Sequence, residues 1–133
     1  MSVKSRFELS PCGLMVTDHR LQLMWAADES PKGLTHAKAE KYAADLRLGG
    51  FDDWRQPDRW ELCSICDLTR TDPCIDTSVF RSNGSWVWTR ENYASVSGCA
   101  WNVNFFLGYT DIDLPSYEAR VRAVRSVASS ARQ

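Results

Sequence analysis

The segment of residues 49–57, GGFDDWRQP, constrains the fold most, because it ends one helical pattern and leads into another. Before it, apolar residues recur at the spacing of one helical face: Ala39, Tyr42, Ala43 and Leu46. Thr35 is placed to cap this first helix at its start. The Gly49-Gly50 pair favours its end, because the left-handed backbone after a helix prefers glycine.

The second half of the segment predicts how the next helix begins. Asp58 is placed to cap it, and Glu61 follows three residues later in the capping-box position. We expect Trp54 to fill the core and Arg55 to pair with an aspartate of the loop, since arginine and carboxylate match in a bidentate pair. The sequence therefore predicts two helices joined by a braced turn.

Strand patterns lie on both sides of these helices. Residues 6–9 and a hairpin of residues 15–17 and 21–25 precede them, and residues 86–89, 101–105 and 120–125 follow. This order favours an α+β fold, with two helices packed on a mainly antiparallel twisted sheet, over alternating βαβ units. Arg122 and Arg125, in the last strand, are expected to be structural partners of acidic groups. At 133 residues, we predict a single domain over residues 1–126 and a flexible tail over 127–133.

Composition argues against several classes of function. The net charge is −1 and the basic residues form no stripe, which disfavours a nucleic-acid partner. No apolar run approaches the length of a membrane span, and the first residues do not resemble a signal peptide. The five cysteines are an odd number, which does not suit a secreted disulfide scaffold. We therefore expect a cytoplasmic protein with reduced thiols and no membrane partner.

Two motifs suggest metal binding, and both have structural interpretations. The tripeptide Gln56-Pro57-Asp58 is one that galactose-binding lectins use to hold calcium and sugar, but Asp58 is better explained as the helix cap. Four cysteines could form a thiolate zinc site, although core packing is favoured: Cys63, Cys66, Cys74 and Cys99. We expect no metal and no cofactor.

Catalytic residues are not predicted. His19 falls in a predicted turn and His36 in the first turn of a helix, and neither has a recognisable nucleophile partner in the sequence. Asp52 and Asp53 could form an acidic pair, but bracing of the loop is the favoured interpretation.

Two sets of residues resemble one small-domain family. In the first half these are Val16-Thr17-Asp18, Leu23-Met24-Trp25, Ala39, Leu46, Leu48, Gly50, Asp53-Trp54-Arg55, Pro57 and Glu61-Leu62. In the second half they are Pro73, Ile75-Asp76, Phe80, Trp88-Thr89, Ala100-Trp101, Val103, Phe105, Gly108, Val121-Arg122 and Val124-Arg125. Together, over about residues 6–126, they resemble the Lcl C-terminal domain family, also called DUF1566.

This resemblance implies a C-type-lectin-like fold, related to formylglycine-generating-enzyme-type domains and to retroelement-diversified variable proteins. It also implies ligand binding, as in surface adhesins that bind glycosaminoglycans and in phage or bacterial receptor-binding proteins. The chain departs from the family pattern at Gln56, where Leu is usual, and at Cys63 and Cys66, where apolar residues are usual. An export signal or collagen-like stalk is not recognised either, which argues against an adhesin.

A binding surface is predicted in the second half of the chain. If Trp101, Val103 and Phe105 point inward along a strand, the alternate residues point outward. The predicted contact residues are Arg90, Asn92, Tyr93, Asn102, Asn104, Phe106, Tyr109, Asp111, Asp113 and Tyr117. Such residue types combine rigid contact area with adaptable hydrogen bonding in paratopes. In retroelement-diversified relatives, the comparable region carries the variable ligand-contacting positions.

The favoured function is a non-enzymatic binding module that presents residues 90–97 and 102–117 to a macromolecular partner, with a protein favoured over a glycan. A phage or mobile-element inhibitor of a host complex fits such a compact module. One alternative is an adhesin-type domain that binds glycans or glycosaminoglycans. Another is a formylglycine-generating-type enzyme with Cys66 or Cys99 as the reactive thiol.

Overall fold

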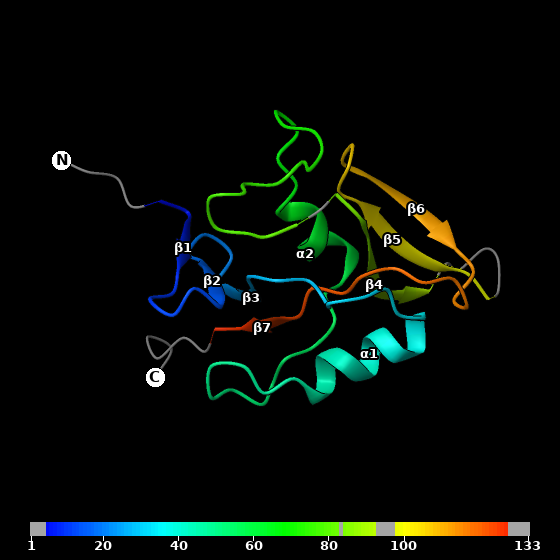
Figure 1. Cartoon of the computed structure of the whole chain (residues 1–133), viewed down its shortest axis with the longest axis horizontal. Coiled ribbons are helices and arrows are strands. Elements are labelled where there is room, and N and C mark those ends of the chain that lie inside the picture. Colours follow the sequence, from blue (N-terminus) through cyan, green and yellow to red (C-terminus); the bar gives the residue numbers. More distant parts are fainter. Residues whose placement is uncertain (1–4, 83, 93–97, 128–133) are drawn as a thin grey trace.

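The computed structural model describes residues 5–82, 84–92 and 98–127, which form an α+β fold with two helices and two antiparallel sheets (Figure 1). The first sheet has the order β1-β2-β3-β7, made of β1 (Phe7–Leu9), β2 (Met15–Asp18), β3 (Leu23–Ala26) and β7 (Val124–Ser126). The second has the order β4-β5-β6, made of β4 (Trp86–Asn92), β5 (Ala100–Asn104) and β6 (Tyr109–Asp113). The predicted single sheet is thus divided into two, and α1 (His36–Asp45) and α2 (Arg59–Ser64) lie between β3 and β4 in the sequence.

The predicted N-terminal hairpin is confirmed. Strands β2 and β3 pair in register from Met15 opposite Ala26 to Asp18 opposite Leu23. Asp18 is fully buried in this turn and accepts two hydrogen bonds from the Arg6 guanidinium, at 3.0 and 2.8 Å. The turn is therefore fixed by a charged pair as well as by the apolar strands that it joins.

Helix α1 begins where the sequence predicts and ends earlier. The Thr35 hydroxyl accepts from the Lys38 amide at 3.4 Å. The helix stops at Asp45, because Leu46 already has an extended backbone (φ −66°, ψ 135°). Gly49 and Gly50 lie in the following turn, with φ of +66° and +83°. The expectation that these glycines end the helix is wrong; they form the turn that returns the chain to the sheet.

Helix α2 begins with the predicted capping box. The Asp58 carboxylate accepts from the Glu61 amide at 2.7 Å, and the Glu61 carboxylate accepts from the Asp58 amide at 2.9 Å. Arg55 donates two hydrogen bonds to Glu61, both at 2.7 Å. The predicted partner of Arg55, an aspartate of the loop, is therefore replaced by a glutamate of the helix, and Asp53 pairs instead with Arg125 at 2.6 Å.

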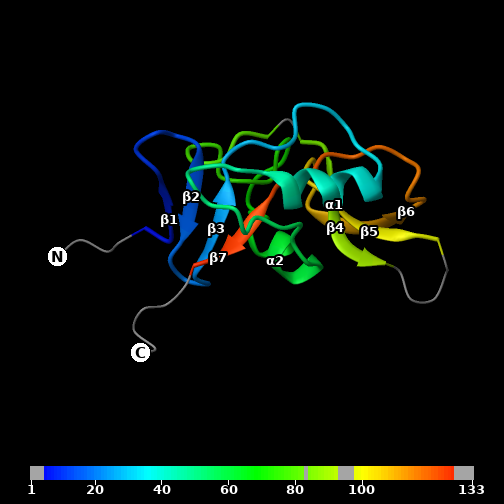
Figure 2. The same ribbon diagram turned by 90° about the horizontal axis from the view of Figure 1, so that it is seen from below.

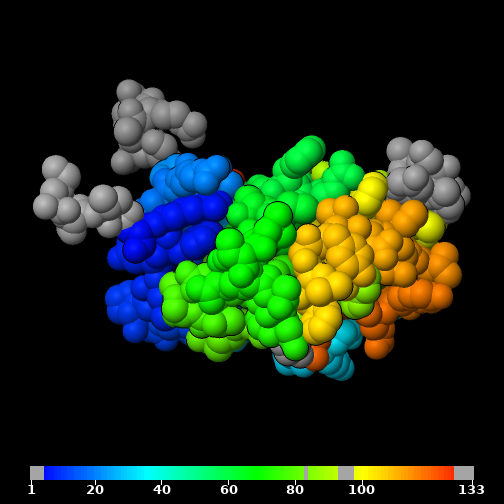
Figure 3. All heavy atoms as spheres, turned by 90° about the horizontal axis from the view of Figure 1, so that it is seen from above, coloured from blue at the N-terminus to red at the C-terminus, as the bar shows by residue number. Residues whose placement is uncertain are grey.

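The core consists of two clusters on opposite faces of the β4-β5-β6 sheet. Val87 and Val103 face α2 and cluster with Leu62. On the other face, Trp88 and Ala100 cluster with residues of α1 and with Trp54, Val121 and Ala123. Figure 2 shows α1 lying alongside β4, while Figure 3 shows the segment that follows α2 (green) between the N-terminal strands (blue) and β5 and β6 (yellow and orange). Both faces of β5 are therefore covered.

Among the residues that the structure describes, no helix has the length and apolar character needed to cross a membrane.

Candidate functional site

The predicted binding surface is not continuous, because the two asparagines of β5 point inward. Asn102 is 1% exposed and Asn104 is 6% exposed, so the prediction that they face outward is wrong. Its premise was that one face of β5 meets solvent, whereas both faces are covered. The Asn104 carboxamide oxygen accepts from the amides of Phe106 (2.7 Å) and Leu107 (3.0 Å) and so fixes the turn between β5 and β6.

The remaining predicted residues are divided between the two sides of the sheet. Phe106 and Tyr109 are exposed at the β5–β6 turn. Arg90 lies 3.7 Å from the Asp58 carboxylate, on the side of α2, and Asn92 is exposed at the end of β4. Tyr93 lies outside the described residues.

Four predicted residues meet in a hollow of about 290 Å³ on the α1 side of the sheet, which we call the β6 hollow. It is lined by Trp86, Trp88, Asn102, Asp111, Asp113, Tyr117, Glu118 and Ala119. The sequence interpretation found Asn102, Asp111, Asp113 and Tyr117 but missed the two tryptophans. Their alternation in β4 was the available signal, since residues two apart in a strand share a face.

Strand register brings these side chains together. Trp88 is paired with Asn102, and Asn102 with Asp111, across three neighbouring strands. Asp113 is paired with Ala100, one step along the same face. The Asn102 amide nitrogen donates to the Asp113 carboxylate at 2.8 Å. The Asn102 carboxamide oxygen is buried and has no hydrogen-bond partner among the described residues.

The floor of the β6 hollow is rigid. Trp88 is fully buried, and its indole N–H donates to the Leu34 carbonyl at 2.8 Å. The His36 ring packs edge-on against Trp88 with 5.1 Å between ring centroids, and His36 Nε2 lies 2.7 Å from the Thr89 carbonyl. His36 therefore holds the first turn of α1 against the sheet. His19, in the predicted turn, lies 2.7 Å from the Glu8 carboxylate.

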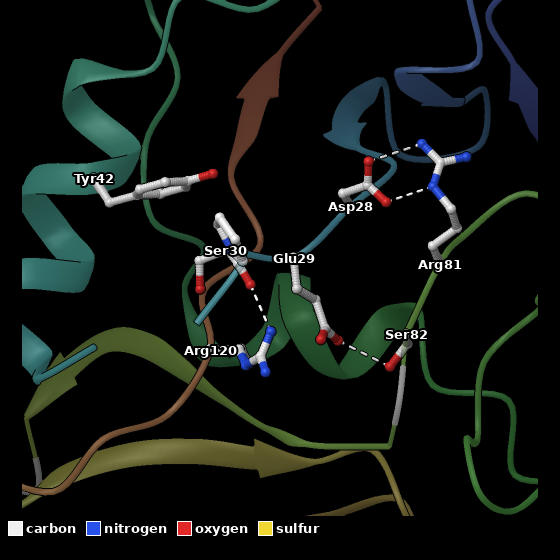
Figure 4. A pocket seen from close by; sticks show the side chains of 8 residues that line it. Asp28, Glu29, Ser30, Tyr42, Arg81, Ser82 and Arg120 are labelled. Carbon is white, nitrogen blue, oxygen red and sulfur yellow. Dashed lines mark hydrogen bonds and ion pairs between the residues drawn. The ribbon is translucent and has the colours of Figure 1, made fainter. Parts of the chain in front are cut away.

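A second, larger hollow of about 570 Å³ lies between α1 and the segment around residue 81. Figure 4 shows that its charged side chains face each other: Asp28 meets Arg81, Glu29 accepts from Ser82, and Arg120 donates to the Ser30 carbonyl. These groups form hydrogen bonds and ion pairs with one another. Such mutual pairing is typical of a loop held in place by its side chains, not of a ligand-binding site.

Arg122 lies buried behind this second hollow as a structural partner, as the sequence predicts. Its guanidinium donates to the carbonyls of Ala26, Ala27 and Arg81, and lies 3.4 Å from the Glu29 carboxylate. Burial lowers the pKa of Arg122 to about 10, although the nearby Glu29 opposes this change.

Three of the five cysteines pack in or against the core, whereas Cys12 is exposed and Cys99, half-buried, belongs to neither cluster. Cys74 is fully buried, and Cys63 and Cys66 pack against the same cluster as Leu62. Burial raises the pKa of Cys66 strongly, and the neighbouring Cys74 and Cys63 add to the effect. Across the described residues, no group of three or more His, Cys, Asp or Glu side chains is arranged to hold a metal ion. In the tripeptide Gln56-Pro57-Asp58, which resembles a calcium-binding motif, Gln56 is buried and the Asp58 carboxylate caps α2.

Comparisons with known proteins place the chain in a family. The curated proteins include no match to it. The family model described as the Lcl C-terminal domain matches residues 14–125, which include both sheets except β1 and the end of β7, both helices and the β6 hollow. The protein is therefore a member of the Lcl C-terminal domain family.

Proposed function

We propose that this domain is a non-enzymatic binding module that recognises a macromolecular partner, with a protein favoured, through the β6 hollow and the surface beside it. The observation that carries the proposal is the hollow itself, where aromatic rings and hydrogen-bonding groups meet on a rigid sheet. Binding sites combine apolar walls with a few placed polar groups in this way.

Exposed apolar side chains beside the hollow support this proposal. Tyr109, Leu114 and Tyr117 lie in or just after β6 and are 44%, 48% and 56% exposed. Phe106 and Leu107, at the other end of the β5–β6 turn, are also exposed. Aromatic residues are enriched in protein interfaces, where they provide contact area at low entropic cost.

The proposal includes the kind of fold and the setting. Strands from both ends of the described chain share one sheet, and a second sheet lies in the C-terminal half, which supports a C-type-lectin-like fold. All five cysteines are free thiols, which supports a cytoplasmic protein. A phage or mobile-element protein that binds a host complex fits this description.

The alternatives receive less support from the geometry. Three carboxylates line the β6 hollow, so an anionic polysaccharide would be repelled there. A formylglycine-generating-type reaction needs a reactive thiol, but Cys66, one of the two candidates, packs against the core, and burial raises the pKa of its thiol.

Capture experiments with matched variants test the proposal. The immobilised full chain is compared with Tyr117→Ala, beside the hollow, and with Trp60→Ala, a 75% exposed aromatic on α2. We expect Tyr117→Ala to reduce capture of a specific protein by roughly tenfold, since interface tyrosines often contribute more than 1 kcal/mol. Trp60→Ala should leave capture unchanged. Equal loss in both variants, or loss in Trp60→Ala alone, contradicts the proposed surface.

A further inference from the structure

The β6 hollow contains acidic groups that form no ion pair within the described part of the chain. Elsewhere in the described chain, acids at key positions have basic partners: Asp18 pairs with Arg6, Asp53 with Arg125 and Glu61 with Arg55. Asp111, Asp113 and Glu118 line the hollow without an ion pair to any described residue. Three negative charges therefore gather at one concave place in a chain whose net charge is only −1.

Among the buried side-chain polar atoms of the hollow, the one left without a partner in the described residues is an acceptor. The Asn102 carboxamide oxygen is buried without a partner in the described structure, and its nitrogen is already used by Asp113. The indole N–H of Trp88 is used by the Leu34 carbonyl. Each carboxylate can accept several hydrogen bonds, and among the described residues Asp111 receives one, from the neighbouring Ile112 amide at 2.8 Å. The carboxylate and carboxamide oxygens of the hollow thus outnumber its donors, the Trp86 indole N–H and the Tyr117 hydroxyl, and a ligand rich in N–H groups would match these acceptors.

The walls of the hollow suit a flat organic cation. Trp86 and Tyr117 offer accessible aromatic surface next to the carboxylates, while Trp88 is fully buried beneath them. Cations are attracted to such faces, and a planar guanidinium can stack on a ring while its N–H fork binds a carboxylate. The three carboxylates are not arranged as a metal site. A volume of about 290 Å³ lies at or below the lower end of pockets for drug-sized ligands, and so suits a single side chain.

We propose that the β6 hollow binds the guanidinium group of an arginine side chain that a protein partner inserts. This inference rests on the proposed binding function and names its chemistry. Asp111 and Asp113 bind the guanidinium N–H groups, Asn102 accepts at the floor, and the Trp86 ring packs against the stem. Arginine fits better than lysine because its five donors are fixed in a plane and match several acceptors at once.

A titration of the full chain with N-acetyl-arginine methylamide, followed by NMR, tests this assignment. We expect saturable shifts at the Trp86 indole and the Asn102 side-chain amide, in the millimolar range, that weaken as salt is raised. The citrulline equivalent has nearly the same shape but no charge and should not bind. Equal binding of the citrulline compound, or tighter binding of the lysine equivalent, overturns the inference.

Charge variants provide the matched control. Asp111→Asn and Asp113→Asn should each weaken binding roughly 3- to 10-fold, since each removes a charge-assisted hydrogen bond. Glu40→Gln removes the same charge from an exposed position on α1, which has no ion pair with the described residues, and should have no effect. If Glu40→Gln and Asp111→Asn weaken binding equally, the loss is explained by the change in net charge, and the assignment of the arginine site to the hollow is overturned. Circular dichroism confirms that each variant is folded.

The same variants separate this inference from the proposed function. If Tyr117→Ala abolishes partner capture but Asp111→Asn and Asp113→Asn do not, the binding surface stands and the arginine inference is overturned. If the arginine compound binds and also competes with the captured protein, both are supported. If the arginine compound binds but Asp111→Asn leaves partner capture unchanged, the hollow binds free guanidinium compounds. That result overturns the inference that a partner protein inserts an arginine side chain.

Discussion

Buried polar groups in this domain differ in how well they are satisfied. Arg122 uses carbonyls and Glu29, and Asn104 uses the amides of a turn. Gln56 differs, because it is 3% exposed and neither atom of its carboxamide has a hydrogen-bond partner within the described residues. A buried amide without partners loses its hydration and gains nothing in return.

Replacing this amide by an apolar group should therefore stabilise the fold. We expect Gln56→Leu to raise the free energy of unfolding by about 1 kcal/mol or more. Leucine has a volume similar to that of glutamine but lacks the unsatisfied carboxamide. Urea unfolding measures the change as a higher midpoint with an unaltered slope. Gln56→Met should act in the same direction, since the gain comes from losing the amide. A lower midpoint in both variants would show that the carboxamide stabilises the fold.

At the scale of elements, α2 depends on charge at its first turn. Burial alone would raise the pKa of Glu61, but hydrogen bonds from Arg55 and the Asp58 amide, together with the Arg55 charge, outweigh it and lower that pKa from its ordinary value of 4.5. The folded state therefore holds the carboxylate charged at pH values where the unfolded chain would begin to protonate it. Its stabilising contribution is complete above about pH 4.5 and is lost as the pH falls further.

The pH dependence of unfolding tests this conclusion. We expect the urea midpoint of the wild type to fall as the pH is lowered from 5 to 3, whereas Glu61→Gln should be less stable at pH 7 and show a shallower decline. Lys38→Met changes an exposed residue of α1 that forms no ion pair with the described residues, and should keep the wild-type slope below pH 5. A Glu61→Gln profile parallel to that of the wild type would contradict the assignment.

Local signals predicted the elements better than they predicted the site. The caps at Thr35 and Asp58 are set by neighbours in the chain, and both were found from the sequence. The inward direction of Asn102 could not be read in this way, because it depends on residues 117–119 lying over the second face of β5. Glu118 was missed for the same reason: it lines the hollow only because the chain after β6 returns past Trp86.

At the scale of the whole molecule, the last described segment connects the two sheets. Arg120 forms a parallel bridge to Val87 of β4, while Val124 pairs with Trp25 of β3 and with Arg55. Val121, between them, is fully buried. Loss of this segment would remove contacts from both sheets at once, so the two sheets should unfold together.

Fluorotryptophan NMR can follow each sheet separately. Trp25 reports on the first sheet and Trp88 on the second, and both are fully buried. We expect their native signals to disappear at the same urea concentration. Val121→Ala should lower the urea midpoints of both signals equally, because it leaves a cavity in the connecting segment. We expect the free energy of unfolding to fall by about 2 kcal/mol. Separate transitions for Trp25 and Trp88 would show two independent folding units.

The position of β6 at the end of its sheet has a consequence for aggregation. Its outer edge leaves backbone groups without a strand partner in the order β4-β5-β6, and such edges can pair with another chain. Asp111 and Asp113 place two negative charges on this strand, and like charges on two copies would repel each other. The carboxylates that line the hollow therefore also protect the edge. A variant that neutralises both should self-associate more readily, so selection for solubility and selection for ligand binding would act on the same two residues.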